Sequence, residues 1–268
     1  MRKEIYTTIT VILLLVYLSA CKSSPTSPTN TTTSSSIGAS NYYPNGDGTS
    51  YKYSVVRTDS AQNKTTGTRT VNYSGTTVVG TVTYQNEIDT TTFLTLINTT
   101  RTLFVKDSNG VSLMLDTTGF FDIIPATYKP FISFSPTIKI FQSSFLNGTP
   151  WTVFDMSLKD GALSIDLVNV VATYMDNEQV SLSLSSGTVT QSAAKVQYTI
   201  KLNIPNASNP LAGIVSSTYT AYAWFVNNIG IVQIQGNATL LDAFTGNGIN
   251  FADTTSSITQ NLINYNIK

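Results

Sequence analysis

Five acidic residues lie within one short stretch of the chain, between residues 155 and 178. Two carboxyl groups about 5–9.5 Å apart, with well-separated pKa values, can hydrolyse a glycosidic bond. Spacing along the chain fixes neither that distance nor those pKa values, and acidic side chains are mostly solvated at the surface. A carbohydrate-active enzyme or a glycan-binding surface protein is therefore the second of two functional hypotheses, and the first is given at the end of this section. The five residues are Asp155, Asp160, Asp166, Asp176 and Glu178.

The residue types that the sequence lacks exclude several kinds of chemistry. There is no histidine, which removes Ser-His-Asp triads and histidine-ligated metal sites. The one cysteine is Cys21, and no Walker-type or Gly-x-Gly-x-x-Gly loop occurs. The 15 basic and 15 acidic residues balance and form no basic run, so nucleic acid is not an expected partner. We expect no enzymatic activity, no metal and no cofactor.

Alternating apolar and polar residues indicate that β-strands position the polar side chains. In the stretch VQYTIKLNI, Val196 and Tyr198 fall on one face and polar residues take the other. Turn dipeptides such as Asn109-Gly110 separate many of these stretches. No long stretch has a helical period, although residues 240–244 could form one helical turn. The predicted strands are 51–58, 68–73, 77–85, 91–97, 102–106, 111–116, 137–141, 151–158, 163–174, 180–185, 196–204, 218–226, 230–236 and 257–267.

These strands predict an all-β fold of antiparallel sheets, either a curved open half-barrel or a β-sandwich. Residues 120–136 contain three prolines and several aromatic residues, and predict an ordered loop or a crossover. Because loops commonly carry function, the aromatic side chains of this loop are our candidates for contact with a ligand or a partner. They are Phe120, Phe121, Tyr128, Phe131 and Phe134.

The start of the chain has the pattern of a secretory signal peptide. A short charged segment precedes an almost wholly apolar run at residues 9–18, which is too short to cross a bilayer. The sequence Leu18-Ser19-Ala20-Cys21 resembles the lipobox of bacterial lipoproteins. This resemblance implies cleavage before Cys21 and attachment of acyl chains, such as palmitate, at that residue. We therefore expect residues 1–20 to be a lipoprotein signal peptide.

The residues after the signal predict a tether followed by one domain. Residues 21–40 comprise the acylated cysteine and a flexible Ser/Thr/Pro-rich tether, which has too little apolar surface to fold. Residues 41–268 predict a single β-rich domain. Lys22 and Ser23 follow Cys21 where enterobacterial lipoproteins retained in the inner membrane carry aspartate, so the outer membrane is the expected location. The sequence does not indicate which side of that membrane the domain faces.

Both ends of the predicted domain resemble a family of uncharacterised bacterial lipoproteins. The family pattern of Tyr-aromatic-Pro, then Gly, then Trp or Tyr entering a strand is matched by Tyr43, Pro44, Gly48 and Tyr51. The stretch NNIGIVQIQ resembles its C-terminal Gly-Val-Gly-Leu-Val hairpin, with Asn228 where glycine is common. The resemblance implies an anchored, β-rich envelope protein and brings no known activity. A looser similarity to the half-barrels of lipoprotein carriers implies an apolar concave face.

These features favour a membrane-anchored envelope lipoprotein that is not an enzyme. Its domain would be a binding or structural module that holds an apolar ligand or an envelope protein, besides the membrane lipid joined to Cys21. A curved sheet with a continuous apolar concave face would support this function. Two aspartates facing each other in a cleft lined by Trp or Tyr would support the carbohydrate alternative.

Overall fold

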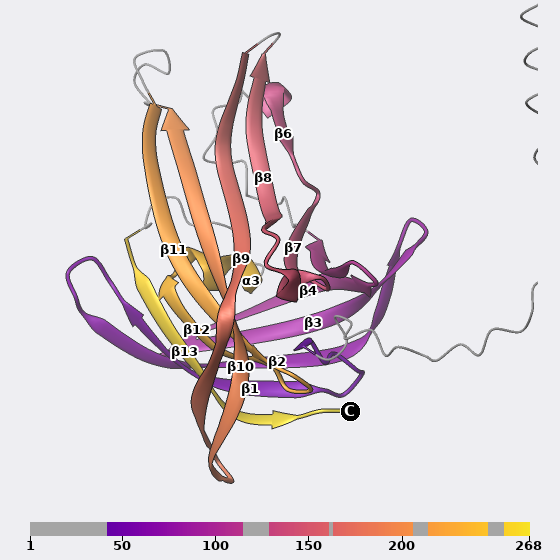
Figure 1. Cartoon of the computed structure of the whole chain (residues 1–268), viewed down its shortest axis with the longest axis vertical. Coiled ribbons are helices and arrows are strands. Elements are labelled where there is room, and N and C mark those ends of the chain that lie inside the picture. The colour runs from indigo at the N-terminus through magenta and orange to yellow at the C-terminus, as the bar shows by residue number, and fades with distance from the viewer. Residues whose placement is uncertain (1–41, 115–128, 161–162, 206–213, 246–254) are drawn as a thin grey trace, which may run out of the picture. The chain divides into compact units, whose positions relative to one another are not determined.

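The computed structural model describes residues 42–114, 129–160, 163–205, 214–245 and 255–268. The chain divides into two units, Met1–Ser36 and Ile37–Lys268, and the described residues all belong to the second. The strands, most of which are labelled in Figure 1, are β1 (Ser50–Thr58), β2 (Lys64–Val79), β3 (Val82–Phe93), β4 (Leu96–Asp107), β5 (Gly110–Met114), β6 (Ile132–Phe134), β7 (Thr137–Gln142), β8 (Trp151–Asp160), β9 (Leu163–Leu184), β10 (Gly187–Pro205), β11 (Ile214–Val226), β12 (Gly230–Asn237) and β13 (Ser257–Asn266). The helical segments are η1 (Lys129–Phe131), η2 (Phe145–Asn147) and α3 (Thr239–Phe244).

Within the described residues, the thirteen strands form one antiparallel sheet. Their order is β6-β8-β9-β10-β11-β12-β13-β1-β2-β3-β4-β5-β7. The sheet therefore contains two meanders, β1–β5 and β8–β13, which the pairing of β13 with β1 joins. The edge strand β7 extends the first meander by pairing with β5, and the edge strand β6 extends the second by pairing with β8. The predicted all-β antiparallel class is confirmed. Of the two predicted architectures, the structure has the open sheet, since its strands form one continuous sheet rather than two.

The inner faces of the two meanders enclose a common core. In Figure 1, β9, β10 and β11 lie close to vertical, whereas β2 and β3 lie across the view. Phe141 of β7 packs on Phe225 of β11, with their ring centroids 5.2 Å apart. Tyr198 of β10 donates a hydrogen bond to the carbonyl oxygen of Ile140 at 2.8 Å. All four side chains are buried, so apolar contacts between strands distant in sequence hold the meanders together.

The alternation that predicted β10 is present in the structure. Val196, Tyr198, Ile200 and Leu202 are buried on one face, and the residues between them are half-buried or exposed. The predicted helical turn at 240–244 is confirmed as α3. Its C-terminal end is fixed to β4, because the hydroxyl of Thr100 donates a hydrogen bond to the carbonyl oxygen of Thr245 at 2.5 Å.

Two predicted strands are wrong because each crosses a hairpin turn. Segment 77–85 contains the turn between β2 and β3 at residues 80–81, and segment 91–97 contains the turn between β3 and β4 at residues 94–95. Thr, Val and Ile favour strands, and residues 94–95 are Leu and Thr, which do not mark a tight turn. Segments 163–174 and 180–185, predicted as two strands, belong to the single strand β9 except for residue 185.

Candidate functional site

A buried ion cluster lies on the inner face of β2 and β3, where the usual alternation is inverted. On β3, Glu87 and Asp89 are buried, whereas Ile88 between them is 36% exposed. Arg69 of β2 is buried beside them. Successive residues of a strand point to opposite faces, so placing Ile88 outside keeps both carboxyl groups on the face that carries Arg69.

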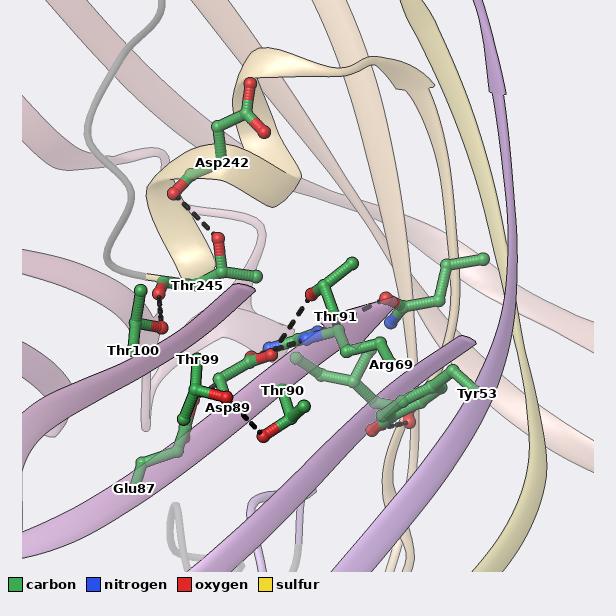
Figure 2. Close-up of polar contacts among 12 residues, drawn as sticks. Tyr53, Arg69, Glu87, Asp89, Thr90, Thr91, Thr99, Thr100, Asp242 and Thr245 are labelled. Atoms are coloured by element: carbon green, nitrogen blue, oxygen red, sulfur yellow. Dashed lines mark hydrogen bonds and ion pairs between the residues drawn. The ribbon is translucent and has the colours of Figure 1, made fainter. Parts of the chain in front are cut away.

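Three side chains around Arg69 offer acceptors to its guanidinium group. Nε of Arg69 donates to Oδ2 of Asp89 at 2.6 Å, and Figure 2 shows the two side chains meeting between the strands. Nη1 donates to Oε1 of Gln260 at 3.3 Å, and Nη2 lies 3.9 Å from Oε1 of Glu87. The guanidinium carbon also lies over the ring of Tyr53, 5.5 Å from its centroid. A planar, delocalised cation suits this combination of forked hydrogen bonds and ring stacking.

A small cavity whose lining includes four tyrosines adjoins the cluster. Tyr43 donates a hydrogen bond to Oε2 of Glu87 at 3.5 Å, and Tyr51 donates to the carbonyl oxygen of Pro44 at 2.8 Å. The cavity has an empty volume of about 280 Å³, part of it open to solvent. The cavity has room for one or two water molecules, and too little for a lipid chain or a sugar ring.

The carboxyl group of Glu87 holds a proton more tightly than an exposed glutamate does. Burial raises its pKa from the ordinary 4.5 to about 7. The charge of Arg69 lowers this pKa, the charge of Asp89 raises it, and hydrogen bonds from Tyr73 and Tyr43 lower it. Near neutral pH the Glu87 carboxyl is therefore about half protonated.

The other two members of the cluster form a buried ion pair, with Nε of Arg69 2.6 Å from Oδ2 of Asp89. Burial raises the pKa of Asp89, and the guanidinium of Arg69 opposes that rise. Burial lowers the pKa of Arg69, but the neighbouring carboxylates of Asp89 and Glu87 together raise it by more than burial lowers it. The net change in this pKa is therefore upward. With Glu87 protonated, the charges of Arg69 and Asp89 cancel inside the core. The cluster also fixes the pairing of β2 with β3, because a slip of one residue would move Arg69 to the outer face.

The acidic residues singled out for glycoside chemistry do not lie in such an environment. Asp155 accepts a hydrogen bond from Ser135 at 2.6 Å, and Glu178 accepts one from Lys195 at 2.7 Å. Exposed carboxylates lack the burial that separates the pKa values of a catalytic pair. The side chain of Asp160 lies outside the described residues. The exposed members are Asp155, Asp166, Asp176 and Glu178.

Two outward-facing aromatic residues of β11, Tyr222 and Trp224, are covered rather than open. Nζ of Lys195 lies 4.9 Å from the ring centroid of Tyr222 and 5.1 Å from that of Trp224. Nε1 of Trp224 donates to Oε2 of Glu178 at 2.8 Å, and Trp224 is only 5% exposed. A sugar-binding platform presents an accessible ring face, and Lys195 already lies over both rings.

The aromatic loop and the lipidation site are only partly within the described residues. Phe131, in η1, is 40% exposed, and Phe134, on β6, is half-buried against the core. Their contact with a ligand or a partner stays a prediction, as does the modification of Cys21. Outside the described residues lie Leu18, Ser19, Ala20, Cys21, Phe120, Phe121 and Tyr128.

The ion cluster was not predicted from the sequence, although one signal for it was present. Glu87 and Asp89 are two residues apart, the spacing that places both on one face of a strand. In the part of the chain that the structure describes, no group of three or more His, Cys, Asp or Glu could hold a metal ion. In that same part, no helix has the length and apolar character needed to cross a membrane.

No family model and no curated protein matches the sequence. Three solved structures are similar to it. A protein of Bacteroides fragilis, described as exported and of YmcC-like fold, is 13% identical and has a TM-score of 0.45, over 84% of this chain and 99% of the other. A protein of Parabacteroides distasonis, described as a lipoprotein, is 13% identical with a TM-score of 0.40, over 84% and 98%. The Escherichia coli protein YmcC, described as a hypothetical lipoprotein, is 10% identical with a TM-score of 0.30, over 80% and 84%. Similarity at this level leaves the function to be argued from the residues of the chain itself.

Proposed function

We propose that this chain is a lipid-anchored protein of the outer membrane and that its β domain is a non-enzymatic binding or structural module. The Leu18-Ser19-Ala20-Cys21 sequence supports the anchor. Acyl chains contribute about 0.8 kcal/mol of membrane affinity per buried CH₂ group, so two or three chains hold a protein firmly.

One structural observation carries the non-enzymatic part of this proposal. The polar groups best placed for chemistry, in the Arg69 cluster, are buried and bonded to one another, and the cavity beside them admits only water. Residues such as Phe104, Phe141 and Phe225 fill the inner face of the sheet and are fully buried. The interior is therefore filled in the part of the chain that the structure describes, which supports contacts on the outer surface and favours an envelope protein over an apolar ligand held inside. The carbohydrate alternative has less support, because the described carboxylates that it would use are exposed.

The anchor is tested by replacing Cys21 with serine and growing cells with an alkyne-labelled palmitate. The wild-type chain should incorporate the label and sediment with outer-membrane vesicles on a density gradient. The Cys21→Ser variant should incorporate no label and leave that fraction. Label retained by the variant, or a wild-type chain that is soluble after cell disruption, would reject the anchor.

The binding role is tested by crosslinking in intact cells followed by purification of the chain under denaturing conditions. A discrete crosslinked envelope protein, found with wild type and absent when the chain is not expressed, supports a partner. In native mass spectrometry, a mass equal to that of the chain plus a lipid would instead support an interior ligand, provided that denaturation releases the lipid. This result would contradict the proposed contact of the outer surface with an envelope protein.

A further inference from the structure

The turn between β3 and β4 carries three large apolar side chains that contact solvent. Leu94 is 82% exposed, Leu96 is 77% exposed and Ile97 is 71% exposed. We call these three residues the β3–β4 tip. Single exposed apolar residues are common on soluble domains, whereas a contiguous apolar group marks a contact surface.

The backbone at this turn is also unfavourable for the residue that it contains. Leu94 has φ +53°, in the left-handed region where side chains other than those of Gly, Asn and Asp are disfavoured. An asparagine or glycine would fit the turn better and would expose no apolar surface. The geometry of the turn therefore does not favour a leucine at position 94. Contact of its side chain with something outside the domain would explain why a leucine is present.

The segment around the tip has no charge. Residues 90–100 read TTTFLTLINTT and contain no ionisable side chain. The tip is the end of a hairpin, and its three apolar side chains are largely exposed. A specific protein interface buries roughly 800 Å² on each partner, more than three side chains supply. An interfacial contact with lipid requires only a few apolar side chains and no buried charge.

We propose that the β3–β4 tip inserts into the headgroup region of the membrane that anchors the chain, which rests on the lipid anchor proposed above. The tip would be a second, weaker attachment that orients the domain. The described domain starts at Tyr42, and Lys106 near the far end of β4 donates a hydrogen bond to the carbonyl oxygen of Tyr43 at 2.9 Å.

The predicted tether is long enough for both attachments. Leu96 lies in the tip, and Lys106 lies beside the start of the described domain. Along β4 these two residues are roughly 33 Å apart, at about 3.3 Å per residue. A tether of about 20 residues has a root-mean-square span of roughly 25 Å and an extended length of roughly 66 Å. The domain can therefore stand with its tip in the lipid while Tyr42 lies above the membrane surface.

The test uses a single thiol placed at the tip of the full chain. Acylation consumes Cys21, so Leu96→Cys adds the one thiol that a polarity-sensitive dye can label. The labelled protein is reconstituted into phosphatidylethanolamine–phosphatidylglycerol vesicles with and without nitroxide lipid. Val78→Cys, 66% exposed at the β2–β3 turn, is the matched control at the opposite end of β3.

The tip dye should emit at shorter wavelength than the control dye. Nitroxide lipid should quench it at least about twofold more strongly, as expected for insertion about 5–10 Å deep. Adding Leu94→Asn to Leu96→Cys should reduce this quenching. Equal quenching of tip and control would overturn the proposal. If the tip dye were shielded from water in native envelopes but not in lipid vesicles, the tip would contact a protein rather than the membrane, and the proposal would be overturned. Dependence of the signal on protein density rather than on nitroxide lipid would indicate a second copy and also overturn it.

Failure of the anchor is a separate result. If the wild-type protein takes up dye at Cys21, the lipid anchor is rejected. The comparison of Leu96→Cys with Val78→Cys is then repeated in the Cys21→Ser background, with vesicles added from solution. Blue-shifted emission and quenching only at the tip would support insertion without the anchor, and their absence would reject insertion.

Discussion

Replacing Glu87 by glutamine tests whether the buried carboxyl group resists ionisation. Glutamine resembles protonated glutamate in size and keeps an acceptor for the hydroxyl of Tyr43. Because burial raises the pKa of Glu87 from 4.5 to about 7, the folded protein binds this proton more tightly than the unfolded chain does. The stability that the bound proton on Glu87 contributes to the wild-type protein is therefore fully present below pH 4.5. It is lost as the pH rises and is gone above about pH 7.

The size of the effect follows from the same two pKa values. Each pKa unit corresponds to about 1.36 kcal/mol, so a rise from 4.5 to about 7 corresponds to roughly 3 kcal/mol. We expect Glu87→Gln to match wild type near pH 4.5 and to exceed its free energy of unfolding by up to about 3 kcal/mol at pH 8. This is a large part of the total stability of an ordinary domain.

Urea unfolding at several pH values between 4.5 and 8 measures the difference. Trp151 and Trp224 are both buried, so their fluorescence reports the loss of the core. Glu178→Gln is the control, because this exposed carboxyl has a pKa lowered by its hydrogen bond with Lys195 and should show a small effect of the opposite sign. If Glu87→Gln followed the wild-type pH profile, or were less stable at pH 8, Glu87 would be ionised and stabilised by Arg69, and the argument would be wrong.

Arg69→Met should lower the free energy of unfolding by about 3–5 kcal/mol, because it leaves two buried carboxyl groups without a cation; urea unfolding should show a smaller loss at pH 5 than at pH 8. Gly110→Ala should lower it by about 2–4 kcal/mol, since an added Cβ would lie 2.0 Å from the carbonyl oxygen of Phe141 and φ is +143°. Gly148→Ala, where φ is +73° but nothing lies within 4 Å, should lower it by only about 1 kcal/mol. Leu94→Asn should raise the thermal midpoint, because asparagine tolerates the φ of this turn. A Gly110→Ala protein as stable as Gly148→Ala, or a Leu94→Asn protein that melts lower than wild type, would contradict these assignments.

Much of the sheet could be predicted because several strands contain segments of strict alternation. Between Ala194 and Leu202 of β10 each second side chain is buried, and the pattern of Val196, Tyr198 and Ile200 indicated the strand and its inner face together.

The β3–β4 turn escaped prediction because Leu94 and Thr95 do not mark a turn. The β2–β3 turn does contain a turn signal, Gly80 with φ +61°, and the strand-favouring residues on both sides of it outweighed that signal. At the β3–β4 turn, tertiary pairing of β3 with β4 places Leu94 in the left-handed region, which no local preference indicates.

The ion cluster could not be predicted for a related reason. Once 77–85 and 91–97 had been taken as strands, residues 86–90 fell between them, and neither Glu87 nor Asp89 was assigned to a face. Hydrophobicity alone would place Ile88 inside and the two acids outside. The observed inversion depends on Arg69, which lies on the neighbouring strand β2, 20 residues before Asp89, and whose position beside the two acids is a property of the folded sheet.

The pairing of β13 with β1 sets an order of events for folding. Ser50 lies opposite Asn266 and Thr58 lies opposite Ser257, so the first strand finds one of its two neighbours about 200 residues later. Until β13 is available, β1 has an open edge, and the two meanders have no strand-to-strand link. Contacts this distant in sequence close late and slow folding. A chain that emerges N-terminal end first therefore cannot complete this sheet until β13 has followed.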